Sequence, residues 1–302
     1  MGEPHNILCL SSYFKGEAFL RQAASEGARV YLLTQERLLQ SPWPRDILVE
    51  VFAQRNEAPL GETIRTVSYL ARSVRFDRIV ALDDFDVETA AALREHLRMP
   101  GMGDTTARHF RDKLAMRVKA EEAGIAVPEY VHVLNYDQVR EFMARVKPPW
   151  MNKPRAEASA TGITKVENEA QLWELTQAQG DRQSNFLLEK YLPGDVYHVD
   201  SIVSERKVLF ASVNVCGKPP FDVAHGGGIF TTSTVERGSA DEKALVELNE
   251  RVITCMNLVR GVSHIEYIKS RDDGRFYLLE CAARVGGAHI AEMVEAASGI
   301  NL

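Results

Sequence analysis

The sequence is poor in the features that mark secreted, zinc-binding and membrane proteins. Its four cysteines are scattered through 302 residues without a CxxC pair or zinc-ligand spacing, which predicts reduced structural thiols. No apolar run approaches the roughly 18 residues of a membrane helix, and the start MGEPHNILCL has no basic region followed by a long apolar stretch. We therefore expect a cytoplasmic protein that is neither secreted nor membrane-spanning.

An excess of positive charge is also missing. Lysine and arginine number 36 against 42 acidic residues, a net charge of −6, which gives no indication of a nucleic-acid partner. A negative net charge does not exclude a local cationic pocket for an anionic ligand. Hydrophobic residues at 45% and charged residues at 26% are ordinary for a globular chain, and the length allows two or three domains.

The first third of the chain alternates short apolar runs with amphipathic stretches. Strands are expected at 7–11, 29–34, 46–52 and 78–82, with helices at 16–26, 62–74 and 87–96. This order predicts a doubly wound parallel sheet. The turn after the first strand, SSYFKG, lacks G-x-G-x-x-G, so dinucleotide binding is only weakly indicated. After a break at 99–104, a single helix is expected over 105–124.

A second informative stretch is SHIEYIKSRDDGRFYLLECAARVGGAH, in which two strand-like runs flank the turn sequence Asp272-Asp273-Gly274. A three-residue turn would place Glu266 opposite Glu280, and a two-residue turn would leave them one step apart. Opposed like charges destabilise a hairpin, so they must point into water or be compensated. Their apolar neighbours favour a shared divalent cation, and two carboxylates suit Mg²⁺. Arg284, ahead of two glycines, is typical of an anion clamp.

Three further features are unremarkable singly but occur in a suggestive order. Asp112-Lys113 opens a helix, and Lys153 ends a strand that is followed by a loop of small residues at 156–162. Such a loop lets backbone N–H groups approach phosphate closely. An apolar strand then ends in the four residues 189–192, ahead of a Pro-Gly turn.

Together these motifs resemble those of the ATP-grasp enzymes. The matching stretches are DKLAMRVKAEEAGIAVPEY, MNKPRAEASATGITKV, LLEKYLPGDVYHVD and HIEY…LLECAARVGG. The resemblance implies an α/β and α+β protein: an N-terminal doubly wound parallel αβ domain at 1–100, a helical linker at 101–127 and a two-lobed ATP-grasp fold. The small lobe with the phosphate loop would span 128–192. The large lobe with the metal-binding hairpin would span 193–302 and be compact or truncated.

The resemblance also implies roles for individual residues. Residues that would contact ATP are Lys113, Lys153, Ser159, Thr161 and Gly162 at the phosphates, and Glu189, Lys190, Tyr191 and Leu192 at the adenine edge. Asp200 would lie near the ribose or support the residues that do, and Glu266 and Glu280 would hold Mg²⁺. Lys153 and Arg284 would be catalytic, with Arg284 on the transferred phosphate or the substrate carboxylate. One departure concerns the metal: many relatives have E-x-N-x-R, and the Asn position here is Ala282, which offers no ligand for a second Mg²⁺.

The resemblance implies an ATP-dependent ligase that activates a small carboxylate as an acyl phosphate for attack by an amine or thiol. The RVGG ending resembles amino-acid and dipeptide ligases; a homodimer is compatible with it, and neither substrate is identified. Ala282 and the abrupt end favour an alternative, a non-catalytic or regulatory ATP-binding module. The hinge LEKYL resembles biotin carboxylases, a third reading. His198 and His264 are expected to be hydrogen-bonded strand histidines, and His225 either reaches substrate or lies in a surface turn.

Overall fold

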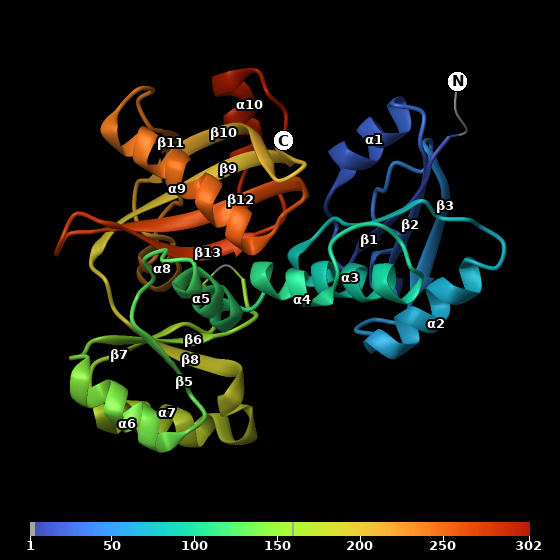
Figure 1. Cartoon of the computed structure of the whole chain (residues 1–302). Helices are drawn as coiled ribbons and strands as arrows, with labels where there is room; N and C mark the ends of the chain where they lie inside the picture. The colour runs from blue at the N-terminus through green and yellow to red at the C-terminus, as the bar shows by residue number, and fades with distance from the viewer. Residues whose placement is uncertain (1–3, 159) are drawn as a thin grey trace. The chain divides into compact units, whose positions relative to one another are not determined.

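The computed structural model describes residues 4–158 and 160–302, and the chain divides into two compact units (Figure 1). The first unit runs to Ala107 and the second from Arg108 to Leu302. The division falls inside the segment predicted as a helical linker.

The first unit is a parallel four-stranded sheet of order β3-β2-β1-β4. The strands are β1 (Asn6–Ser11), β2 (Arg29–Gln35), β3 (Leu48–Gln54) and β4 (Arg78–Ala81), and the helices are α1 (Glu17–Ser25), α2 (Leu60–Leu70) and α3 (Val87–His96), with short 3-10 turns at Glu36–Leu38 and Asp84–Asp86. Leu8 packs with Val67 of α2 and Leu93 of α3, whereas Cys9 packs on the opposite face with Leu20 of α1. Helices therefore cover both faces, as predicted for a doubly wound sheet.

The single helix expected over 105–124 is wrong. The segment consists of α4 (Asp104–Ala107), a 3-10 turn (Arg108–Phe110) and α5 (Lys113–Glu122). Asp112 is extended, with φ −98° and ψ 108°, and its carboxylate accepts from the N–H groups of Leu114 and Ala115. An N-cap inside a helical pattern starts a new helix, because it satisfies amides that a continuous helix would bond internally.

The second unit contains a small antiparallel sheet of order β5-β8-β6-β7. Its strands are β5 (Tyr130–His132), β6 (Trp150–Pro154), β7 (Thr164–Val166) and β8 (Phe186–Lys190), with α6 (Tyr136–Arg145), α7 (Glu169–Gln179) and a 3-10 segment (Gly180–Asn185). Trp150 and Leu188 pack with Phe142 of α6 and Leu172 of α7. Because side chains alternate along a strand, β6 and β8 present Met151, Lys153 and Glu189 on the other face.

The larger sheet of this unit has the order β11-β10-β9-β12-β13 and is antiparallel throughout. Its strands are β9 (Gly194–Ser204), β10 (Lys207–Cys216), β11 (Thr232–Thr234), β12 (Arg260–Ser270) and β13 (Phe276–Ala282), and its helices are α8 (Pro220–Gly226), α9 (Ala240–Met256) and α10 (Ile290–Ser298). One face packs on α9, where Asn249 bonds Ser201 and Tyr267. The opposite face carries His198, Asp200, His264 and Glu266.

The described residues contain neither a disulfide bond nor a helix that could cross a membrane. The four cysteines are free thiols, and three of them are buried. Within residues 4–158 and 160–302, no helix combines the length and the apolar character needed to cross a bilayer.

Candidate active site

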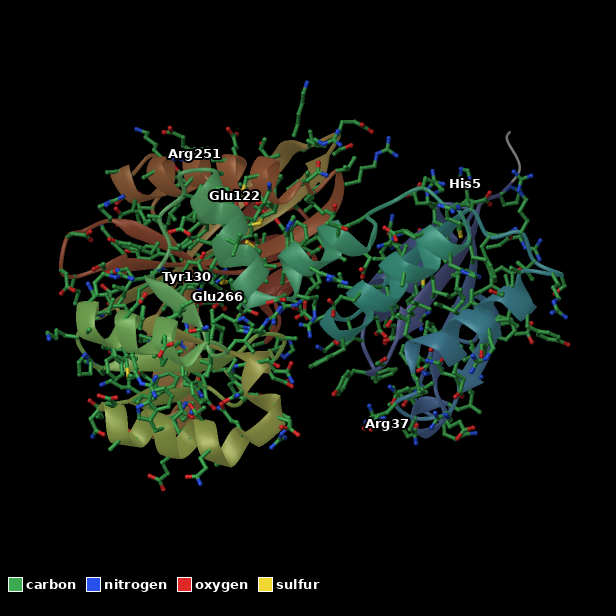
Figure 2. All side chains as sticks on the ribbon, turned by 60° about the horizontal axis from the view of Figure 1, so that its bottom comes forward. His5, Arg37, Glu122, Tyr130, Arg251 and Glu266 are labelled. Carbon is green, nitrogen blue, oxygen red and sulfur yellow. The ribbon has the colours of Figure 1, made fainter. Side chains whose placement is uncertain are left out.

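A cavity of about 480 Å³ lies within the second unit, between its two sheets. Small-lobe residues such as Met151 and Lys190 line one wall, and large-lobe residues such as Ile268 and Glu266 line the other. Figure 2 shows Glu266 on the side of the larger sheet that faces the small lobe. The volume is typical of a site for a small-molecule ligand.

Most of the residues predicted from the sequence meet at this cavity. Those that line it are Lys113, Lys153, Glu189, Lys190, Tyr191, Leu192, Glu266, Glu280 and Arg284. Thr161 and Gly162 are exposed and do not line it, whereas Ala160 and Ile163 of the same loop do. Ser159 lies outside the described residues. The structure thus brings together segments up to 171 positions apart (113 to 284), although the ligand of each residue stays a prediction.

The hairpin of β12 and β13 places Glu266 directly opposite Glu280, but not through the turn length that the sequence suggested. Ser270 N–H bonds the carbonyl of Arg275, so four residues form the turn. The strands pair Tyr267 with Leu278 and then Glu266 with Glu280, which leaves Leu279 as a bulge. This extra residue restores the opposition of the two carboxylates.

Each of the opposed carboxylates has a positively charged side chain beside it. Lys113 Nζ lies 2.9 Å from Glu280 Oε1, and His264 Nε2 lies 3.5 Å from Glu266 Oε1. Both glutamate side chains are 28% exposed, so neither carboxylate simply points into water. These two cations supply the compensation that the like-charged pair requires. Two opposed, accessible carboxylates at a cavity also fit Mg²⁺, which takes one or two protein carboxylates and fills its remaining positions with other oxygens.

The pKa values of Glu266 and His264 reflect their contact. Burial raises the pKa of Glu266, but the hydrogen bond and charge of His264, with further positive charge from Arg284, bring it below the ordinary value. Burial lowers the pKa of His264, but Asp200 and Glu266 outweigh this effect and raise it to about 9. His264 is therefore an imidazolium at neutral pH.

Helix α5 positions Lys113 at its first residue. The buried Lys113 ammonium donates to the carbonyl of Glu157 in the loop of small residues after β6, at 2.6 Å, as well as to Glu280. The N-cap Asp112 also pairs with Arg155, which follows β6. Burial raises the pKa of Asp112, but the hydrogen bond and charge of Arg155 and two backbone amides lower it below its usual value.

We expect Asp112→Ala to lower the free energy of unfolding by about 2 kcal/mol, because it removes an N-cap and leaves Arg155 without this carboxylate. The control is Asn135→Ala. Asn135 caps α6 by accepting two backbone amide bonds of 3.0 Å, and among the described residues no arginine pairs with its side chain. Its loss should therefore lower the free energy of unfolding by about 1 kcal/mol. Urea unfolding at pH 7 measures both losses, and equal losses would contradict a role for the ion pair.

The pH dependence gives a second check on Asp112. A carboxyl whose folded-state pKa is depressed stabilises the protein above its unfolded value, near 3.8, and loses this contribution as pH falls through the folded value. The difference in free energy of unfolding between Asp112→Ala and the unaltered protein should therefore persist down to about pH 4 and become smaller only below that pH.

A buried charge network at the wall of the cavity links α5, β6 and β8 to β13. Arg117, fully buried on α5, donates from Nε to Glu189 Oε1 at 2.6 Å and from Nη2 to the carbonyl of the bulged Leu279 at 2.8 Å. Lys153 Nζ lies 2.6 Å from Glu189 Oε2. Burial raises the pKa of Glu189, but the charges of Arg117 and Lys153 outweigh it and the net pKa is lowered. Sequence reasoning did not single out Arg117, because a lone helical arginine is usually solvated.

Asp200 is fully buried and does not line the cavity. Its carboxylate contacts His198 and His264, which do line it. Of the two positions predicted for Asp200, these contacts favour support of the cavity wall over direct contact with a ligand. Both histidines are hydrogen-bonded strand residues, as expected.

The segment after β13 brings Arg284 to the cavity. Its Nη1 bonds the carbonyl of Val285 at 2.9 Å. A Cβ on Gly286 would lie 3.1 Å from Asp200 Oδ1 and 2.7 Å from Ile290, so a glycine lets this segment approach the sheet closely. Ala282 lines the cavity and offers only a methyl group. His225 is exposed at the end of α8, and its Nδ1 lies 3.0 Å from the carbonyl of Phe221.

A cavity with two flanking lysines and two opposed carboxylates is thus the candidate site, and comparisons with known proteins identify the domain that carries it. Residues 146–292 match the ATP-grasp domain family. The chain therefore carries an ATP-grasp domain.

The relatives include ligases. The L-arginine-specific L-amino acid ligase of Bacillus subtilis is 25% identical over 234 residues, which are 75% of this chain and 56% of the relative. The D-alanine–D-alanine ligase of Nitrosomonas europaea is 31% identical over 125 residues, 39% of this chain and 41% of the relative. This chain thus spans about half the length of the curated relatives that it matches.

Solved structures show the same fold. The L-amino acid ligase of Bacillus licheniformis superposes with a TM-score of 0.78 at 18% identity, covering 100% of this chain and 72% of that one. The biotin carboxylase domain of the Hydrogenobacter thermophilus 2-oxoglutarate carboxylase has a TM-score of 0.76 at 15% identity. The match covers 98% of this chain and 67% of that one. The predicted fold, a parallel αβ domain followed by a two-lobed ATP-grasp fold, is confirmed.

Proposed function

We propose that the protein is an ATP-dependent carboxylate–amine ligase that joins amino acids. The observation that carries the proposal is the convergence of Lys113, Lys153, Glu266, Glu280 and Arg284 on one cavity. The names of the relatives, an L-arginine-specific L-amino acid ligase and a D-alanine–D-alanine ligase, support amino acids as substrates.

In the proposed reaction a carboxylate oxygen of the first substrate attacks the γ-phosphorus of ATP, and ADP leaves. The amine nitrogen of the second substrate attacks the resulting acyl carbon, and phosphate leaves as the nitrogen loses a proton. Lys113 and Lys153 bind and orient the phosphates, and Arg284 holds the reacting anion. Residues 189–192 form the adenine edge. Glu266 and Glu280 hold Mg²⁺, which when bound neutralises phosphate charge.

A carboxylase that uses bicarbonate is the alternative suggested by the hinge and by the fold. Such enzymes carry a Q-V-E segment whose carboxylate is the base for bicarbonate, and here the three positions are Gly286, Gly287 and Ala288. None of them provides a general base. Gly287 and Ala288 line the cavity beside Arg284, where small side chains favour a bulkier substrate than bicarbonate.

The test measures ADP release with MgATP in three series. The first contains pairs of L-amino acids, each pair including L-arginine; the second contains D-alanine alone; the third contains bicarbonate with free biotin. We expect release that requires an amino acid in the first or second series, and a dipeptide detected by mass spectrometry. Release that depends on bicarbonate and biotin alone would overturn the ligase. Tight ATP binding without ADP release in any series would favour the non-catalytic module.

A further inference from the structure

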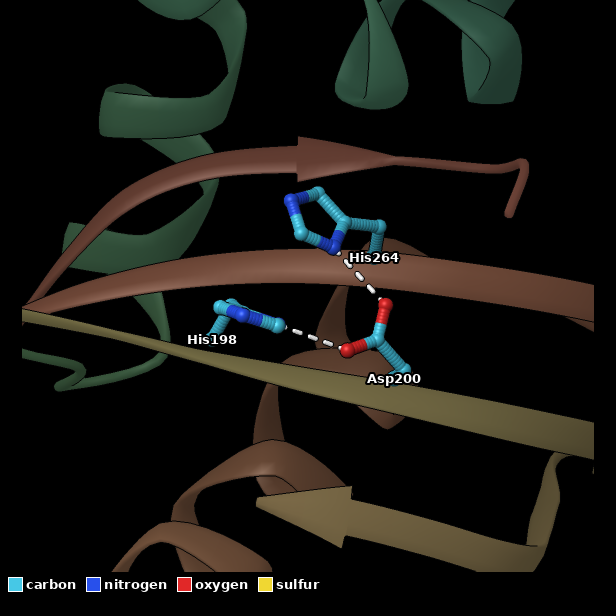
Figure 3. A group of neighbouring side chains, drawn as sticks. All are labelled: His198, Asp200 and His264. Carbon is cyan, nitrogen blue, oxygen red and sulfur yellow. Dashed lines mark hydrogen bonds and ion pairs between the residues drawn. The ribbon is translucent and has the colours of Figure 1, made fainter. Parts of the chain in front are cut away.

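Three buried residues are not used by the proposed chemistry: His198 and His264, which line the cavity, and Asp200, which lies behind them (Figure 3). They come from the neighbouring strands β9 and β12, where His264 lies opposite Asp200 in register. Asp200 and His264 are 64 positions apart, so neither strand alone reveals the cluster.

Asp200 is the centre of this cluster. Its Oδ2 lies 2.6 Å from His198 Nδ1 and its Oδ1 lies 2.8 Å from His264 Nδ1, as the dashed lines in Figure 3 mark. Asn214 donates a third bond to Oδ2 at 3.1 Å. An ionised carboxylate only accepts hydrogen bonds, so both rings present Nδ1–H to Asp200 and turn Nε2 away from it.

These distances indicate hydrogen bonds, although His, Asp and His are common metal ligands. Two ligands about 2.05 Å from a tetrahedral metal would lie roughly 3.3 Å apart. The separations of 2.6 and 2.8 Å are shorter than this. His198 Nε2 is also engaged, at 2.7 Å from Thr232 Oγ1.

The remaining nitrogen of the cluster, His264 Nε2, faces Glu266, 3.5 Å from its Oε1. Asp200, His264 and Glu266 therefore form a chain that ends on one of the two opposed carboxylates. On β13 the residue opposite His264 is Ala282, which supplies no polar atom to orient either carboxylate.

We propose that His264, held by Asp200, is a positioning residue that fixes the Glu266 carboxylate for the divalent cation. The inference rests on the metal role of Glu266 in the proposed function and extends it to His264 in the cavity wall and to Asp200 behind it. A fixed imidazole N–H occupies one side of the carboxylate and leaves its other lone pairs directed at the cavity. Without it, the side chain of Glu266 must be ordered by the cation itself, which weakens binding.

The test uses His264→Asn, because the Asn amide nitrogen can take the place of Nδ1 and keep the bond to Asp200 while the contact with Glu266 is lost. His264→Gln is the complementary variant, with an amide that reaches toward Glu266 but not Asp200. The control is His132→Gln, a strand histidine of the small lobe whose Nε2 lies 2.7 Å from the carbonyl of Ser184, away from the cavity lining.

The measurement is Mn²⁺ binding to the protein–ADP complex by electron paramagnetic resonance, with ADP affinity in EDTA measured separately. We expect His264→Asn to weaken Mn²⁺ binding about 10- to 100-fold, with ADP affinity in EDTA and the melting temperature unchanged. His264→Gln should retain more of the Mn²⁺ affinity than His264→Asn, and His132→Gln should retain all of it.

Other outcomes separate the inference from the function on which it rests. Wild-type Mn²⁺ affinity in folded His264→Asn, together with loss of binding in Glu280→Gln, would overturn the positioning role alone. Unchanged Mn²⁺ binding in Glu280→Gln would overturn the assignment of the metal site to Glu266 and Glu280. Mn²⁺ binding without nucleotide that disappears in His198→Gln would place the cation in the cluster and also overturn the inference.

Discussion

Replacing Glu280 by glutamine should lower ATP-dependent turnover about 1,000-fold or more and leave the protein folded. A neutral amide oxygen is a poor ligand for Mg²⁺, and losing the cation removes about 4 kcal/mol of stabilisation from the phosphoryl-transfer step. Position 282 supplies no substitute ligand, since it holds alanine. ADP release with the best amino-acid pair measures the effect.

The same substitution should not stabilise the protein, although it removes one of two opposed like charges. The buried Lys113 ammonium already pairs with Glu280 at 2.9 Å, so the amide leaves that ammonium with a weaker partner. We expect an unchanged or slightly lowered melting temperature. The control is Glu205→Gln, at an exposed Glu in the turn after β9 that pairs with Arg260; it should change neither quantity. A folded Glu280→Gln protein with wild-type turnover would refute the metal assignment.

Local signals in the sequence were sufficient for the elements that carry the site. Asp272-Asp273-Gly274 between two apolar runs predicts the hairpin, and small residues after Lys153 predict a loop beside the cavity. The register was not predictable, because it depends on the bulge at Leu279. That bulge brings the Leu279 carbonyl to Arg117, a contact between residues 162 positions apart.

The sequence did not reveal the tertiary contacts that join several of the residues it pointed to. His198 and His264 alternate with apolar residues, a pattern that predicts buried strand positions but not a shared partner. Their partner Asp200 was assigned only through the resemblance, and the sheet shows why it must be acidic: it accepts bonds from both rings. The helix start at Asp112-Lys113 was readable in the sequence as an N-cap, as the structure confirms, whereas the helical pattern on both sides suggested one continuous helix over 105–124.

The largest loss of stability should follow Arg117→Met, which keeps the apolar stem and removes the buried guanidinium. Glu189 would then remain buried with Lys153 alone, and the carbonyl of Leu279 would lose its donor. Breaking a buried pair by removing one partner costs about 3–5 kcal/mol. Arg260→Met, which breaks the exposed pair with Glu205, should cost less than about 1 kcal/mol.

Unfolding of the second unit can be followed by itself. Trp150 lies on β6 and Trp173 on α7, and the third tryptophan, Trp43, belongs to the first unit. Urea titration of Trp fluorescence in a Trp43→Phe background therefore reports on the unit that holds Arg117. Separate transitions of the two units are then not mistaken for one.

The partner variant and the pH dependence test the mechanism of the loss. Arg117→Met combined with Glu189→Gln should cost less than the sum of the single changes, because the uncompensated charge is gone. The depressed pKa of Glu189 contributes stability above its unfolded value of 4.5, and this contribution is lost as pH falls through the folded value. Without Arg117 the pKa of Glu189 rises, so acidification should cost the variant less than the unaltered protein. Additive losses, or parallel pH profiles, would show that Arg117 stabilises the unit by packing and not by its charge.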